Sequence, residues 1–390
     1  MKLYFKFIKF LLFIIFHFLF LSINSNLSFI YPTAITLSDG NILVVEKNGI
    51  YICDPTFSNI LSREFIFNDE DQIKNKDELS KVILKRKTPQ IIGLINFKIY
   101  IFDYDGKLLY NSFSKLIDDS NIQYCALIPL SFQNNALYYI IGYFDSYNFL
   151  NLIYYKYNKS DNTNIYITSK IDARFRMEDS DYSYSFQNKG LSCEYMDEYS
   201  DNAFSILVCF YIIISDNIEY LIEGFYSLTT DSLENYYYIS SDYYNVQNPK
   251  FIKSDKTYNN KKALICLVSS DNKATCYKFL ISGDVGYFYS SASIKKKCRD
   301  EIYGMNVRYL FETKEVVFSC SDSDGSIQAA IYSEELSTPE SSFKQFISCE
   351  SIYGYSVLYS NNKSDYYVVS DVKCDGNENP FTLLITSTGK

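Results

Sequence analysis

The feature that most constrains the fold of this 390-residue chain is a recurring pair of apolar segments joined by a tight polar turn. The segments are rich in β-branched and aromatic residues, and Asp, Asn, Gly and Ser interrupt them, as is typical of strands and turns. The recurring units span residues 33–53, 99–110, 136–157, 204–226, 262–281, 314–333 and 365–386. Two turn dipeptides, Asp39-Gly40 and Asn48-Gly49, suit the positive φ angles of two-residue hairpins. The pattern predicts an all-β fold built from repeated hairpins.

The spacing of these units points to a repeat architecture. The turns lie near residues 48, 105, 146, 216, 271, 323 and 376, which is about 55 residues apart on average. Three or four short strands per unit, repeated about seven times, resemble a β-propeller. The resemblance is architectural, because the chain has no Trp for a Trp-Asp motif and no Gly-Gly doublet of the kelch kind. We therefore expect a β-propeller of about seven blades, and the alternative is a pair of disulfide-linked β-sandwich domains divided near residues 160–190.

If the blades form a closed ring, we expect the two ends of the chain to share one blade. Propellers commonly complete one blade with strands from both chain ends, which removes an exposed sheet edge. Here Leu27–Tyr31 could join the blade that ends with Phe381–Thr386. We also expect long loops between blades at Ser62–Pro89 and at Glu178–Gly190.

The N-terminus has the pattern of a secretory signal peptide. Three lysines precede the uncharged apolar run Phe10–Ile23, and the polar residues Ser25 and Asn26 follow it. This run is shorter than the roughly 20 residues of a spanning helix, and no later run reaches that length. We predict that residues 1–25 are a signal peptide and that residues 26–390 form one propeller-like domain, secreted or displayed on the cell surface. An N-terminal ectodomain of a longer membrane protein, continuing beyond Lys390, is an alternative.

Composition excludes several classes of chemistry. The one histidine, His17, lies in the predicted signal peptide, so the mature chain lacks imidazole-dependent catalysis and His-containing zinc sites. The net charge of −9 does not favour nucleic acid as a partner. We expect no enzyme, no cofactor and no metal, with a carbohydrate-active propeller using Asp, Glu and Tyr as the alternative.

Two Asp-rich turns are candidate calcium sites. Asp103 and Asp105 before Gly106 resemble a fragment of a calcium loop, as do the two Asp residues before Gly325. Asp-Gly is also the favoured sequence of a hairpin turn, and this is the interpretation we adopt.

The cysteine pattern predicts disulfides. Ten cysteines lie in the mature part, an even number that favours disulfides in a secreted chain. Eight form close successive pairs: Cys193/Cys209, Cys266/Cys276, Cys298/Cys320 and Cys349/Cys374. Cys53 and Cys125 could pair across units or remain thiols. The tight Cys doublets of zinc sites are absent from the sequence.

The predicted function is a non-catalytic interaction or adhesion module that binds a protein or glycan partner. The predicted contact residues are Tyr182, Tyr184 and Phe186, because Tyr and Ser together make adaptable binding surfaces. Three N-glycosylation motifs, at Asn26, Asn158 and Asn362, are compatible with a secreted protein.

Overall fold

The protein is described here by a computed structural model. The structure describes residues 29, 32–55, 59–74, 78, 81–87, 89–112, 114–117, 122, 124–133, 135–145, 150–166, 171–173, 187–196, 205–215, 218–228, 233–240, 251–256, 262–268, 273–282, 285–297, 305–310, 314–321, 327–333, 335–336, 339–345, 349–359, 366–374 and 381–386.

The described strands form seven antiparallel sheets, which follow one another along the chain. The first contains β1 (Thr33–Thr36), β2 (Ile42–Glu46), β3 (Gly49–Cys53) and β4 (Ile60–Ile66). The second contains β5 (Val82–Lys87), β6 (Gln90–Ile95), β7 (Lys98–Asp103) and β8 (Leu108–Asn111). The third contains β9 (Cys125–Gln133), β10 (Ala136–Phe144), β11 (Leu150–Asn158), β12 (Thr163–Tyr166) and β13 (Ile171–Ala173). The fourth contains β14 (Gln187–Met196), β15 (Ser205–Ser215), β16 (Ile218–Leu228) and β17 (Leu233–Ser240).

The last three sheets continue the pattern. The fifth contains β18 (Phe251–Lys256), β19 (Lys262–Val268), β20 (Lys273–Ser282) and β21 (Val285–Lys297). The sixth contains β22 (Met305–Leu310), β23 (Glu315–Ser321), β24 (Ile327–Ser333) and β25 (Pro339–Gln345). The seventh contains β26 (Cys349–Tyr359), β27 (Tyr366–Cys374) and β28 (Phe381–Thr386).

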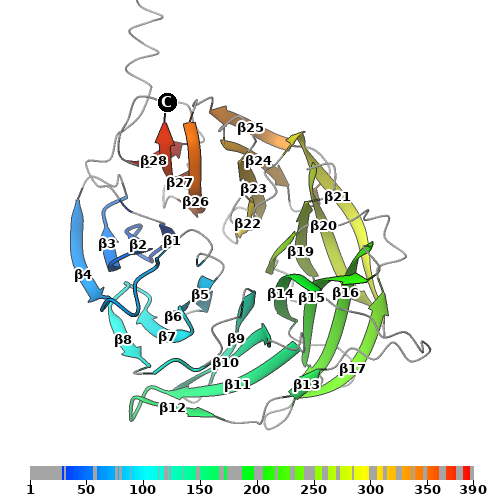
Figure 1. The fold of residues 1–390 in the computed structure, drawn as a ribbon, viewed down its shortest axis with the longest axis horizontal. Helices are drawn as coiled ribbons and strands as arrows, with labels where there is room; N and C mark the ends of the chain where they lie inside the picture. Colours follow the sequence, from blue (N-terminus) through cyan, green and yellow to red (C-terminus); the bar gives the residue numbers. More distant parts are fainter. Residues whose placement is uncertain are drawn as a thin grey trace, which may run out of the picture.

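The sheets form a closed ring with their first strands innermost (Figure 1). Each first strand contacts the first strand of the next sheet, in the order β1, β5, β9, β14, β18, β22 and β26, and β26 contacts β1. A ring of radially arranged meanders is the architecture of a β-propeller. The chain folds as a β-propeller. The alternative of two β-sandwich domains is wrong, because the sheets pack around one axis rather than in two separate pairs.

The blades are less uniform than the sequence suggested. Five of the described sheets are regular four-stranded blades, where about seven blades were predicted. In the third sheet, β12 and β13 both pair with β11, β12 opposite Tyr155–Asn158 and β13 opposite Leu150–Leu152. They therefore share the outer position as two short strands. The seventh sheet has three described strands.

One hairpin was placed out of phase by the sequence analysis. In the second blade, the turn between its second and third strands lies at Asn96-Phe97, both with positive φ (47° and 65°). The Asp105-Gly106 turn instead joins β7 to β8, the third and fourth strands. Turns without Gly give a weaker sequence signal, because residues other than Gly, Asn and Asp rarely adopt positive φ.

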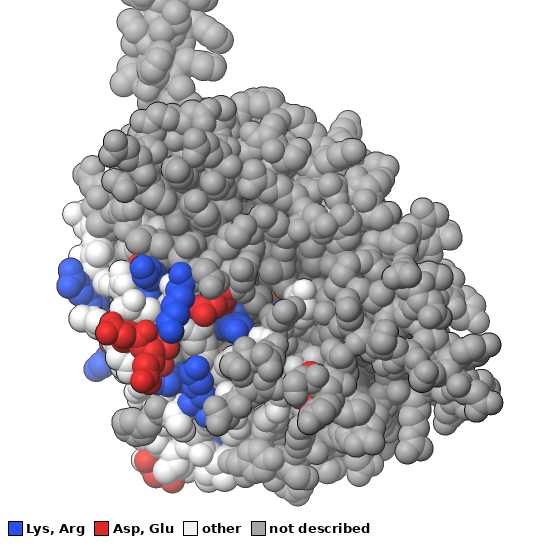
Figure 2. Space-filling model, viewed as in Figure 1, with Lys and Arg blue, Asp and Glu red and all other residues white. Residues whose placement is uncertain are grey.

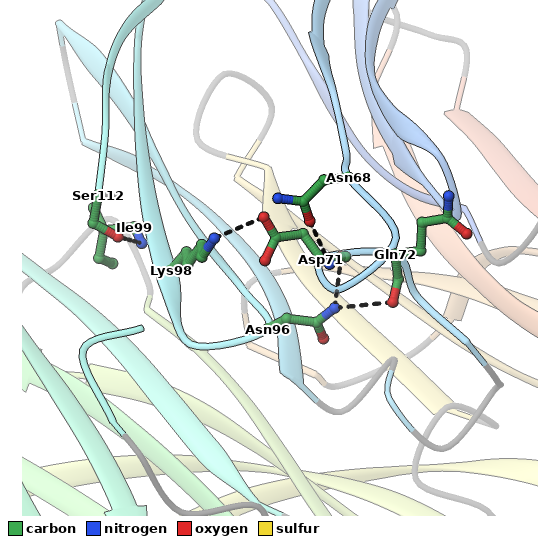
Figure 3. A network of polar contacts seen from close by, with 7 residues as sticks. All are labelled: Asn68, Asp71, Gln72, Asn96, Lys98, Ile99 and Ser112. Atoms are coloured by element: carbon green, nitrogen blue, oxygen red, sulfur yellow. Dashed lines mark hydrogen bonds and ion pairs between the residues drawn. The ribbon is translucent and has the colours of Figure 1, made fainter. Parts of the chain in front are cut away.

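The stretch Ser62–Pro89, expected as one long loop, begins in one strand and contains another near its end. Its two ends belong to β4 and β5, which leaves a connector of residues 67–81 between blades. A polar network fixes the described part of this connector to the β6–β7 turn (Figure 3). Lys98 Nζ lies 2.7 Å from Asp71 Oδ2, and Asn96 Nδ2 donates to the carbonyl oxygen of Asp71 at 2.9 Å.

Apolar side chains fill the spaces between blades. One buried cluster joins the first two blades through residues such as Leu43, Val45, Leu84 and Tyr100. A second cluster joins the second and third blades, and a third joins the third and fourth. Strands such as β2 are buried along their whole length, because both faces of the sheet pack against neighbours.

Phe29, which precedes β1, packs against the first sheet. It is 3% exposed and packs in a cluster with Ala34, Ile42 and Cys53, and its ring centroid lies 6.1 Å from that of Tyr51. This cluster lies on the opposite face of the first sheet from the cluster shared with the second blade. The expected pairing of Leu27–Tyr31 with β28 involves residues 27, 28, 30 and 31, which lie outside the described residues, so it stays a prediction.

We expect Phe29→Ala to lower the free energy of unfolding by about 3–5 kcal/mol, because it removes a buried aromatic side chain. If Leu27–Tyr31 completes the last blade, the backbone amides of Phe381–Thr386 should also exchange faster in the variant. Phe29→Leu, which keeps most of the apolar volume, is the control and should cost much less. Urea denaturation with hydrogen-exchange mass spectrometry measures both effects. Unchanged exchange in β28 would contradict the strand pairing.

Candidate functional site

The predicted contact residues Tyr182, Tyr184 and Phe186 lie outside the described residues. The segment that contains them was expected to be a loop through Gly190, but β14 begins at Gln187. Residues 187–190 are therefore strand, which corrects the loop boundary.

Strand β14 alternates between a core face and a polar face. Leu191, Cys193 and Tyr195 are buried in the cluster between the third and fourth blades. The intervening residues Ser192 and Glu194 must point to the other face, because successive strand residues alternate. This alternation places a hydroxyl and a carboxylate where β14 meets the first strands of other blades.

Glu194 is the centre of a polar network between these first strands. Its Oε1 accepts a hydrogen bond from Ser254 Oγ of β18 at 2.7 Å and lies 3.2 Å from Lys85 Nζ of β5. Ser254 Oγ also lies 2.6 Å from Ser192 Oγ. We call Lys85, Ser192, Glu194 and Ser254 the axial network. It ties blades two, four and five together directly.

Further contacts extend this pattern around the ring. Asp255 Oδ2 accepts the Tyr309 backbone N–H at 2.8 Å, which links β18 to β22. The Arg86 guanidinium donates to the carbonyl oxygen of Thr36, which links β5 to β1, and it also lies over the Tyr104 ring. Each of these groups lies in the second half of its first strand. The contacts therefore lie toward the face of the ring at which the first strands end.

The axial network is built for structure rather than for reaction. Glu194 is 6% exposed and Ser254 is 8% exposed, and the carboxylate is matched by the Lys85 ammonium and a hydroxyl donor. A buried charge is tolerated when it is paired and hydrogen-bonded in this way. Ser192 is partly exposed, and its hydroxyl is hydrogen-bonded to that of Ser254.

Other candidate chemistry is not supported in the part of the chain that the structure describes. Asp103 Oδ1 accepts the backbone N–H groups of Asp105 and Lys107, and Gly106 has a φ of 90°. These bonds make the sequence a hairpin turn, as expected. No group of three or more His, Cys, Asp and Glu side chains is placed to hold a metal ion among the described residues.

The described residues on the face drawn in Figure 2 carry charges of both signs. Over the blades formed by β1–β8, basic and acidic side chains are interspersed. Within the described segments, no helix is long and apolar enough to cross a membrane.

Two predicted disulfides are present. Cys193–Cys209 joins β14 to β15 and Cys266–Cys276 joins β19 to β20, with Cα atoms 4.1 and 4.0 Å apart. In each case the two cysteines are direct partners in the strand register. Both bridges are buried within clusters between blades, so they also serve as apolar packing.

The remaining cysteines follow the prediction as far as they are described. Cys320 in β23 is disulfide-bonded, and Cys298 lies outside the described residues. Cys349 and Cys374 are opposite one another in the register of β26 and β27. Cys53 and Cys125 are buried thiols. Burial of Cys53, and to a smaller extent the negative charge of Asp54, raises the pKa of its thiol to about 12.

Sequence reasoning did not identify the axial network. Lys85 fell within the expected loop Ser62–Pro89, and Glu194 was not among the expected site residues. The alternation of polar with apolar residues in β14 was a usable signal, but the partners lie 109 and 60 residues away in sequence.

Comparisons with known proteins are limited to the fold. No family model matches the chain, and no curated protein matches it. The β-propeller domain of Vanderwaltozyma polyspora Nup133 is 11% identical, with 91% of this chain and 94% of that chain covered and a TM-score of 0.48. Saccharomyces cerevisiae Sqt1 is 8% identical, with coverages of 93% and 86% and a TM-score of 0.48. The lectin SapL1 is 9% identical, with coverages of 79% and 92% and a TM-score of 0.44.

The axial network should contribute measurable coupling to stability. Lys85→Met and Glu194→Gln should each lower the free energy of unfolding by about 1–3 kcal/mol, because each leaves a buried group without its partner. The double variant should lose less than the sum, with a coupling of about 1 kcal/mol or more. Urea denaturation of the four proteins gives this value, and Lys107→Ala in the exposed β7–β8 turn is the control. Simple additivity would show that the pair contributes nothing specific.

Peptide mapping without reduction should find Cys193–Cys209, Cys266–Cys276, Cys298–Cys320 and Cys349–Cys374 linked in secreted protein.

Cys53 should resist alkylation at pH 8 in the native state, because its thiol stays protonated far below a pKa of about 12. It should react once the protein is unfolded in urea. Native-state labelling of Cys53, or free thiols at Cys193 and Cys209, would contradict this assignment.

Proposed function

We propose that the protein is a secreted or surface-displayed interaction module, without catalytic activity, that binds a protein or glycan partner. The observation that carries the proposal is a closed ring of sheets whose strands are cross-linked by the buried disulfides Cys193–Cys209 and Cys266–Cys276. Disulfides of this kind persist in oxidising compartments, which supports an extracellular location. Rigid scaffolds with variable connecting segments are suited to recognition.

The axial network supports a binding role over an enzymatic one. Its carboxylate, Glu194, is engaged by Lys85 and Ser254. Catalysis by paired carboxylates needs one group that donates a proton and a second that acts as base or nucleophile. The described first strands bring Glu194 and Asp255 into separate, satisfied contacts.

We place the contact surface at Tyr182, Tyr184 and Phe186, in the segment between β13 and β14. Tyr supplies rigid apolar area with a polar tip, and the neighbouring acidic residues suit a basic or neutral partner. Loss of the leader lysines would bring the net charge from −9 to −12, which favours encounter with such partners.

Replacement of Tyr182, Tyr184 and Phe186 by Ala should weaken partner capture at least about tenfold, because aromatic anchors dominate most interfaces. The purified protein would be immobilised and exposed to cell-surface extracts and to a glycan array. The matched control is Leu61→Ala, Ile66→Ala and Ile165→Ala, which removes the exposed large apolar side chains of β4 and β12. Equal capture by the aromatic triple variant would move the contact surface elsewhere. Turnover of an arrayed glycan would overturn the non-catalytic assignment.

A further inference from the structure

The turn between β11 and β12 carries one of the three glycosylation motifs, Asn158-Lys159-Ser160. The motifs at Asn26 and Asn362 lie outside the described residues. Asn158 lies among the described residues, so its solvent exposure and hydrogen bonds are known.

The turn is open to solvent. Residues 159–162 are exposed, and Asn158 at the end of β11 is partly exposed. Asn158 Oδ1 accepts the backbone N–H of Ser160 at 3.1 Å, so the amide oxygen holds the turn. The amide nitrogen, Nδ2, is the atom that an N-linked sugar would modify.

The bonds of Asp161 leave room for this modification. Hydrogen bonds from the Thr163 hydroxyl, and also from the Asn158 side chain, hold the pKa of Asp161 below its usual value. An N-linked sugar replaces one of the two Nδ2 hydrogens, and the other can still be donated to Asp161. The modification therefore breaks no bond of the turn.

Neighbouring Asn side chains serve the core instead. Asn162 Oδ1 accepts the Tyr157 hydroxyl at 3.1 Å, and Asn164 Oδ1 accepts the Tyr139 hydroxyl at 2.9 Å. Tyr139 and Tyr157 are almost fully buried, so these two amides satisfy hydroxyls between blades. Neither Asn162 nor Asn164 is followed by a Ser or Thr in the motif position. The Asn158 amide instead bonds within the turn, to the Ser160 N–H and to Asp161, and Asn158 alone of these three has Ser at the motif position.

We propose that Asn158 is an N-glycosylation site of the mature protein, an inference that rests on the proposed secretion. In the reaction, Nδ2 forms a bond to C1 of the first sugar of a lipid-pyrophosphate-linked oligosaccharide. The C1–oxygen bond breaks, the lipid pyrophosphate leaves, and Nδ2 loses one proton.

The glycan would lie at the opposite end of β11 from the residues that pair with β13. Strand β13 pairs with the start of β11, with Ala173 opposite Leu150, and Asn158 is at the other end of the same strand. Eight residues of extended strand separate these ends by roughly 27 Å. The segment that leads from Ala173 to Tyr182 therefore starts at the edge of the blade remote from the glycan.

The test is expression of the full chain in a secreting eukaryotic cell. The Asn158 peptide of the wild-type protein should carry a glycan that an amidase removes, converting Asn158 to Asp and adding about 1 Da to the peptide. Asn158→Gln and Ser160→Ala should abolish that modification, whereas Ser160→Thr, which keeps the hydroxyl, should retain it. Asn26→Gln and Asn362→Gln are the controls and should leave the Asn158 glycan in place. A secreted, folded wild-type protein with unmodified Asn158 would overturn the proposal.

A second expression separates this inference from the proposed function. The chain is also made with residues 1–25 replaced by a secretory signal of the host. Failure of export with the chain's own leader would count against the proposed secretion. A glycan at Asn158 in the exported protein with the host signal would still support the site, and its absence there would overturn it.

Discussion

Burial of both faces of each blade is the constraint on which the rest of the structure depends. In the first blade, Leu43 and Val45 pack toward the second blade, while Ile42 and Val44 pack on the opposite face. A sheet that is apolar on both faces cannot be stable alone, because each face requires a neighbour. A row of such sheets has two unsatisfied ends, and the ring removes both when β26 meets β1. Phe29 packs on the face of the first sheet opposite the second blade, which is a consequence of the same requirement.

Tyrosine takes much of the volume that other chains fill with Trp or Leu. Tyr100, Tyr139, Tyr157 and Tyr309 are among the largest fully buried side chains that the structure describes. A buried phenol costs free energy unless its hydroxyl is hydrogen-bonded, and burial raises the pKa of Tyr139 well above its usual value. In the β11–β12 turn, Asn side chains meet this requirement by accepting the hydroxyls of Tyr139 and Tyr157.

Features decided by local sequence could be predicted, and features decided by distant partners could not. The hairpins that turn at Asp39-Gly40 and near Asn48-Gly49 were placed correctly, because alternation and turn chemistry act over a few residues. The turn at Asn96-Phe97 was missed because it reaches positive φ without Gly. Strand β5 fell within the expected loop Ser62–Pro89, since its charged residues Lys85, Arg86 and Lys87 give no apolar run. In the fold, Lys85 instead meets a carboxylate from a strand 109 residues further along the chain.

The same distinction separates what holds a blade from what holds the ring. The disulfides Cys193–Cys209 and Cys266–Cys276 close loops of 16 and 10 residues, each between adjacent strands of one sheet. Each disulfide restricts the unfolded chain and so stabilises the fold by about 2–4 kcal/mol. Neither of the two forms a covalent bond between blades. Cohesion between the described blades comes from apolar clusters and from buried polar contacts such as Lys85–Glu194 and Asp255–Tyr309. Reduction should therefore weaken individual blades first, whereas loss of the axial network should loosen the ring while the disulfides stay intact.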